Sequence, residues 1–145
     1  MNIKEFKLGM MPTNSFLVWK EKEAILFDCG GDDLSKLESF IEEKNFILEK
    51  VIFTHGHYDH IGGLLKLKEI YPDVVVYIGK EEEEFLTNSD LSLSNYLINK
   101  NFKYKDSYKT LKDGDIIDGF LVIDTPGHTQ GGKSFFHKES GIVIV

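Results

Sequence analysis

The densest group of side chains able to bind a metal lies in the segment THGHYDH at residues 54–60. Three of the five histidines of the chain stand there with one aspartate, at the spacing His-x-His-x-Asp-His. Neutral imidazole nitrogens bind zinc and similar ions well, so this run predicts a metal site. The alternative is a histidine-rich surface loop or a purification-tag remnant, but a tag would be terminal and would not alternate with Gly, Tyr and Asp.

The spacing within the segment indicates more than one position for a metal. His55 and His57 differ by two residues, so in an extended chain their side chains point to the same side. Asp59 and His60 are adjacent, and we expect them to point elsewhere. So short a loop cannot easily bring four donors to one ion. Two neighbouring ions, or one ion with a carboxylate behind its ligands, fit better.

A third ligand for the first ion is expected from another part of the chain, because a catalytic zinc usually has three protein ligands and one water. His128 is the candidate, since it follows an apolar strand and lies in a turn-rich loop. The alternative is an ordinary loop histidine. His137 lies between Phe136 and Lys138 in a predicted strand, and we expect it to be structural or on the surface.

The elements that must position these residues alternate between strands and helices. Helical periodicity predicts helices over 34–45 and 61–71, and the acidic run 81–84 predicts the exposed start of another helix rather than a metal site. The polar segment 88–109 is expected to be a loop with some helix. The apolar runs expected to form strands are 2–8, 15–20, 24–28, 46–53, 74–78, 121–124, 132–137 and 141–145.

Composition limits the class of protein. The chain has 145 residues, of which 41% are hydrophobic, and this suits one globular domain over residues 1–145. A net charge of −7 disfavours nucleic acid as a partner. No apolar run approaches the ~20 residues of a membrane helix. The lone Cys29 fits a reducing compartment, so we expect a cytoplasmic protein in which Cys29 is structural; a redox role is the alternative.

Two segments, THGHYDHIGG at 54–63 and PGHTQGG at 126–132, together resemble the signature of the metallo-β-lactamase-fold superfamily. Within it the chain most resembles the glyoxalase II-like metal-dependent hydrolases. The resemblance covers essentially the whole chain and implies an α+β fold, a four-layered αββα sandwich. The related flavodiiron oxygen reductases usually carry Glu where His57 stands, so the resemblance favours hydrolysis.

The resemblance also implies a ligand set and a reaction. The residues matching His55, His57 and His128 bind the first of two divalent metal ions, and those matching Asp59 and His60 contribute to the second. Zinc is expected, with iron and manganese as alternatives. In such enzymes a metal-bound hydroxide attacks an ester-like carbonyl of a small-molecule substrate, and Asp59 would orient the water. A thioester is the expected substrate, with lactones, phosphoesters and other esters as alternatives.

The chain departs from the family pattern at its end. The family carries a Gly-Asp pair after a strand like 142–145, and that aspartate bridges the two metals, but here the sequence stops at Val145. We therefore expect a truncated form in which the second half of the sandwich is incomplete and sheet edges promote self-association. An inactive or weakly metal-binding module of the same fold is the alternative.

Overall fold

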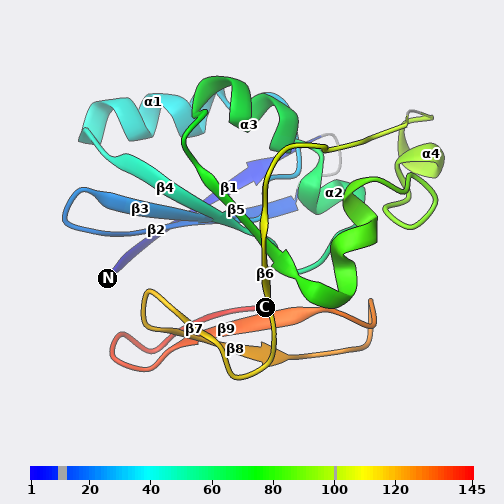
Figure 1. Cartoon of the computed structure of the whole chain (residues 1–145). Helices are drawn as coiled ribbons and strands as arrows, with labels where there is room; N and C mark the ends of the chain where they lie inside the picture. Colours follow the sequence, from blue (N-terminus) through cyan, green and yellow to red (C-terminus); the bar gives the residue numbers. More distant parts are fainter. Residues whose placement is uncertain (10–12, 100) are drawn as a thin grey trace.

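Two β-sheets packed face to face form the centre of the molecule, and helices cover the outer side of the larger sheet (Figure 1). The structure is a computed structural model that describes residues 1–9, 13–99 and 101–145. The strands are β1 (Asn2–Leu8), β2 (Thr13–Lys20), β3 (Glu23–Phe27), β4 (Ile47–Ile52), β5 (Val75–Gly79), β6 (Lys109–Leu111), β7 (Ile116–Ile117), β8 (Phe120–Asp124), β9 (Lys133–His137) and β10 (Ile142–Ile144). The helices are α1 (Ser35–Lys44), α2 (Tyr58–Ile61), α3 (Leu64–Ile70), the 3₁₀ helix η1 (Lys80–Leu86) and α4 (Ser94–Leu97).

The larger sheet brings the predicted donor loop to an edge shared by several strands. Its order is β1-β2-β3-β4-β5-β6, and the neighbours from β3 to β6 run parallel. The carboxyl ends of parallel strands meet at one edge of a sheet, where ligands commonly bind. Asp28 after β3, Thr54 after β4 and η1 after β5 therefore lie at the same edge.

The apolar pattern of the central strands supports two separate cores. In β3, Leu26 belongs to the core beneath the helices, whereas Phe27 belongs to the core between the sheets. The Phe27 ring lies 5.1 Å from the ring centroids of both Phe120 and Phe135 in the second sheet. A strand buried on both faces needs the nearly continuous apolar run seen in the sequence.

The predicted α+β fold class is confirmed for the layers that the described residues form. Across the described residues, α1 and α3 cover one face of the six-stranded sheet and the four-stranded sheet, of order β10-β9-β8-β7, covers the other (Figure 1). The outer face of the second sheet exposes Ile116, Leu121, Ile123 and Val143. Self-association through this face stays a prediction.

The predicted helix over 61–71 is confirmed in its main part as α3, which begins three residues later than predicted. The structure has two short helices, α2 and α3, separated by Gly62 and Gly63. The Gly63 N–H donates to the Cys29 carbonyl at 2.8 Å, so this amide does not continue the helix that contains Tyr58. Helical periodicity alone could not reveal this break, because the break depends on a contact with a distant loop.

The prediction that the acidic run 81–84 is exposed is wrong in part. Residues 81–84 lie in η1, and Glu82 is only 1% exposed, because η1 packs against the loop that carries the histidines. The segment 88–109 contains α4, in agreement with the prediction of some helix, and ends in β6.

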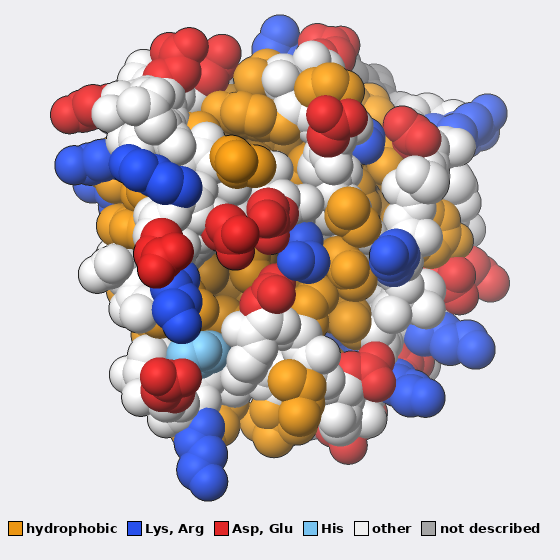
Figure 2. Space-filling view, turned by 60° about the vertical axis from the view of Figure 1, so that its left-hand side comes forward, with side chains coloured by type: hydrophobic (Ala, Val, Ile, Leu, Met, Phe, Trp, Pro, Cys, Tyr) orange, Lys and Arg blue, Asp and Glu red, His pale blue; other side chains and the backbone are white. Residues whose placement is uncertain are grey.

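The surface shown in Figure 2 mixes both signs of charge. Basic and acidic side chains are interspersed there, with apolar side chains between them. The exclusion of nucleic acid stays a prediction. Within the ranges that the structure describes, no helix has the length and apolar character needed to cross a membrane.

Substituting Gly63 with alanine is expected to lower the free energy of unfolding by about 3 kcal/mol. A Cβ at this position would lie 2.1 Å from the Gly31 carbonyl oxygen and 2.6 Å from the Cys29 sulfur, so backbone would have to move. The matched control is Gly127→Ala, where a Cβ meets nothing within 4 Å. Thermal or urea unfolding should show a change below about 0.5 kcal/mol for the control. Equal effects of the two substitutions would contradict this packing argument.

Candidate metal centre

Five donor side chains predicted from the sequence converge at the carboxyl edge of the parallel strands. Donor atoms of His55, His57 and His128 lie within 4.8 Å of one another, and so do those of His55, Asp59 and His60. His57 Nδ1 lies 3.0 Å from His128 Nε2, although the two residues are 71 positions apart in the chain. His55 belongs to both groups, so the structure offers two adjoining donor sets.

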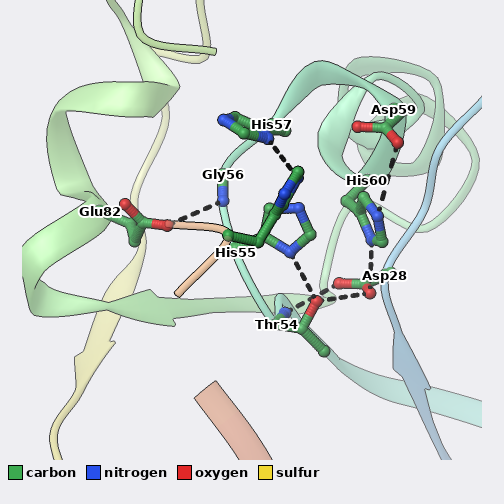
Figure 3. A network of polar contacts seen from close by, with 9 residues as sticks. Asp28, Thr54, His55, Gly56, His57, Asp59, His60 and Glu82 are labelled. Carbon is green, nitrogen blue, oxygen red and sulfur yellow. Dashed lines mark hydrogen bonds and ion pairs between the residues drawn. The ribbon is translucent and has the colours of Figure 1, made fainter. Parts of the chain in front are cut away.

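A buried carboxylate joins the two strands that deliver the site. Asp28 is 3% exposed, and its Oδ1 accepts the Thr54 backbone N–H at 2.8 Å. Its Oδ2 accepts the Thr54 hydroxyl at 2.8 Å and faces His60 Nδ1 at 2.8 Å (Figure 3). Asp28 therefore fixes the root of the histidine loop and the orientation of one ring in it.

This network assigns the protonated nitrogen of two histidines. His55 Nδ1 lies 3.1 Å from Thr54 Oγ1. Because the Thr54 hydroxyl proton is directed to Asp28, its oxygen accepts the Nδ1–H of His55. The lone pair of His55 is then on Nε2, which is buried and has no hydrogen-bond partner. His60 likewise directs Nδ1 to Asp28, and its Nε2 lies 3.6 Å from an Asp59 oxygen.

Electrostatics favours neutral donors in the first group. Burial, followed by the neighbouring histidines, lowers the pKa of His55 to about 3. Burial and the nearby His128 also lower the pKa of His57. Burial opposes the charged form of His60 too, but the hydrogen bond and charge of Asp28 outweigh it and raise the pKa overall.

These residues fit a divalent metal ion. A buried imidazole nitrogen without a partner costs free energy unless something binds its lone pair. Neutral imidazoles with a carboxylate are a donor set that zinc and iron accept. The outer hydrogen bonds from His55 and His60 resemble those that orient histidine ligands in metal sites.

Two side chains outside the donor set behave as the sequence suggested. His137 is buried, hydrogen-bonds Ser140 at 2.7 Å and packs on the Phe120 ring, as expected for a structural residue. Cys29 is fully buried, and its burial, reinforced by the Asp28 charge, raises the pKa of the thiol. The thiol therefore stays protonated, which opposes a redox role.

Asp28 was missed as a site residue by the sequence analysis. The sequence does place it at the end of a buried strand and before Cys29 and two glycines. A carboxylate at the carboxyl end of a parallel strand is a usable signal for a site, because such ends converge. What the sequence could not show is that its partners are Thr54 and His60.

Comparison with known proteins decides the family. The model of the metallo-β-lactamase superfamily matches residues 8–145. The chain belongs to the metallo-β-lactamase superfamily. Metallo-β-lactamase-type structures resemble it over nearly its whole length: the BLEG-1 B3 metallo-β-lactamase superposes with a TM-score of 0.87 at 25% identity, covering 98% of this chain and 70% of that one. TTHA1623, in a di-iron-bound form, gives 0.83 at 27% identity and covers 97% and 69%.

Curated members of the superfamily point to hydrolases. The chain is 28% identical to the probable metallo-hydrolase YqgX of Bacillus subtilis (strain 168), over 99% of this chain and 69% of that protein. It is 31% identical to the hydroxyacylglutathione hydrolase GloC of Haemophilus influenzae, over 99% and 70%. The chain spans between 39% and 70% of the length of the curated relatives compared with it.

Acidification is expected to release metal from the group containing His60 before the group containing His57. A raised pKa means that His60 keeps a second proton to higher pH than a free histidine, and this proton must leave Nε2 before a metal binds. The lowered pKa values of His55 and His57 mean that no proton competes there until the pH is lower. Metal content after dialysis at a series of pH values from about 8 to about 5 should therefore fall in two steps. Loss of metal from the His57 group first, detected in His60→Ala and His128→Ala variants, would contradict the assignment.

Proposed function

We propose that this chain carries the metal-binding part of a metal-dependent hydrolase that cleaves thioesters. The observation that carries the proposal is His55, which belongs to both donor groups and has a buried Nε2 without a hydrogen-bond partner. The substrate class is supported by the relatives named hydroxyacylglutathione hydrolases, since a hydroxyacylglutathione is a thioester. The substrate would be a small molecule.

From the donor groups we infer a place for each of two divalent ions. His55, His57 and His128 would hold one, and Asp59 and His60 would hold the other, with His55 within reach of both. We propose zinc, with iron as the rival because TTHA1623 is a di-iron-bound relative. A divalent ion held there would act as a Lewis acid and make water a nucleophile near neutral pH.

The residues of this chain supply orientation and a proton acceptor. Asp59 lies half-buried at the start of α2. There its carboxylate can orient a water molecule toward the donor groups and accept a proton from that water. Thr54 and Asp28 keep the metal-facing nitrogen of His55 unprotonated. The lone, buried Cys29 suits a reducing compartment, and we propose that the protein works in the cytoplasm.

Thiol release from a hydroxyacylglutathione tests the function. We expect hydrolysis that a chelator abolishes and added zinc restores, and slower hydrolysis of the matching oxygen ester, a lactone and a phosphoester. Fast hydrolysis of one of these other substrates would replace the thioester with that class. A protein that is folded and loaded with metal, yet hydrolyses none of them, would support the rival account of an inactive metal-binding module.

A further inference from the structure

Lys133, outside the donor set, lies where three elements of the site meet. It begins β9, and its side chain is only 1% exposed. Its ammonium group donates to the two carboxylate oxygens of Glu81 at 3.0 and 2.8 Å and to Asp124 Oδ1 at 2.6 Å. A lysine ammonium has three protons, so all of its donors are used.

The partners of Lys133 connect the two ligand loops. Asp124 ends β8 and pairs with Lys133 across the hairpin, so the loop 125–132 that carries His128 begins and ends at this pair. Glu81 belongs to η1. The backbone N–H of Lys133 donates to the Thr54 carbonyl at 2.8 Å, immediately before His55. One residue therefore ties the base of the His128 loop to η1 and to the other ligand loop.

The helix η1 packs tightly against both ligand loops. A Cβ at Gly56 would lie 2.4 Å from the Phe85 Cβ, and a Cβ at Gly131 would lie 2.7 Å from the Glu82 Cγ. Glu82 is buried, and its carboxylate accepts the Gly56 N–H at 3.4 Å (Figure 3). Because both loops meet η1 through glycines, the position of η1 sets the separation between the loops.

The ion pairs of Lys133 can be removed without leaving a buried charge. Burial lowers the pKa of Lys133, but the hydrogen bonds with Asp124 and Glu81 outweigh burial and raise it, so the ammonium stays charged. The Glu81 and Asp124 side chains are 45% and 47% exposed. Both carboxylates remain hydrated when the lysine is replaced, and the variant should fold.

We propose that Lys133 is a positioning residue that holds His128 against His57 by clamping the loop 125–132 onto η1. The effect of Lys133 on metal affinity rests on the proposed function, whereas the effect of Lys133 on the loop 125–132 does not. Because the clamp fixes the base of the loop, the His128 ring is held with its Nε2 at 3.0 Å from His57 Nδ1.

Amide hydrogen exchange of the loop in metal-free protein tests the clamp directly. Two amides report on it, because Thr125 donates to the Gly132 carbonyl and Gly127 to the Thr129 carbonyl. Lys133→Met should speed exchange over 125–132 about tenfold, and exchange in α1 should not change. Lys133→Arg and the exposed control Lys138→Met, on the same hairpin, should behave as the unmodified protein. Unchanged loop exchange in Lys133→Met would overturn the proposal.

Zinc affinity, measured by competition with a chromophoric chelator, tests the consequence. Lys133→Met and Glu81→Gln should each weaken one zinc ion about tenfold, and the double variant should be no weaker than either single one. If the losses of zinc affinity in the two single variants add up in the double variant, Lys133 does not act through Glu81, and the proposed clamp is overturned. If the unmodified protein takes up no zinc while loop exchange still responds to Lys133→Met, the proposed function fails and the positioning role stands.

Discussion

Replacing His55 with alanine is expected to abolish binding of the ion that His57 and His128 also hold. His55 lies within reach of both groups, but its Nδ1–H is donated to Thr54, so its one free lone pair, on the buried Nε2, binds one ion. The zinc affinity should fall by more than about a hundredfold. Removing only a residue that hydrogen-bonds to a metal ligand costs up to about a hundredfold, and removing the ligand itself should cost more. Chelator-sensitive thioester hydrolysis should be lost with it. Elemental analysis of the purified and zinc-loaded variant measures the first effect.

Three further variants serve as controls for this result. His128→Ala should remove only the ion of the His57 group, and His60→Ala only the other, because each belongs to a single group. His137→Gln should keep both ions, since His137 bonds Ser140 and lies outside both groups. If His55→Ala retains both ions, the role given to His55 is wrong.

The second large effect is expected at Asp28. Asp28→Ala leaves two buried Thr54 donors without an acceptor and places alanine at a φ of +63°. The expected loss of unfolding free energy is about 3–5 kcal/mol, from the unpaired donors and the backbone strain. Urea unfolding of metal-free protein measures this loss. Asp73→Ala, at an exposed position, is the control and should change stability by less than about 0.5 kcal/mol.

Asp28→Asn separates the stability effect from the effect on metal binding. Asparagine tolerates the left-handed conformation and keeps one oxygen for the Thr54 N–H. Its amide group, however, would donate to His60 Nδ1 and move the imidazole proton to Nε2, the nitrogen that faces the metal. We expect a smaller loss of stability than in Asp28→Ala. Zinc should bind 10- to 100-fold more weakly at both positions, because the Thr54 hydroxyl can no longer donate to residue 28 and would donate to His55 Nδ1 instead. The ¹⁵N shifts of the His60 ring would show the change of tautomer, and an unchanged tautomer would contradict the role given to Asp28.

Much of the fold could be predicted because its signals are local. The apolar runs of β3, β4 and β5 are continuous, as strands buried on both faces require, and α1 follows a clear helical periodicity. The break between α2 and α3 could not be predicted in this way. It depends on the Gly63 amide reaching the Cys29 carbonyl, a contact between residues far apart in the sequence.

At the candidate site, too, some residues could be predicted from local sequence and others could not. The five donors could be predicted from residue type and spacing, since few other uses explain three histidines and an aspartate in six residues. The supporting residues could not be predicted. The roles of Asp28, Glu82 and Lys133 arise from burial and from partners in other loops and in η1, which the local sequence does not show.

The metal content of the folded chain tests the central claim most directly. After loading with zinc and removal of excess metal, elemental analysis should find about two ions per chain in the unmodified protein, as expected for a two-metal hydrolase site. It should find one in His128→Ala and one in His55→Ala. A folded, unmodified chain that retains no zinc, iron or manganese above background would contradict the account.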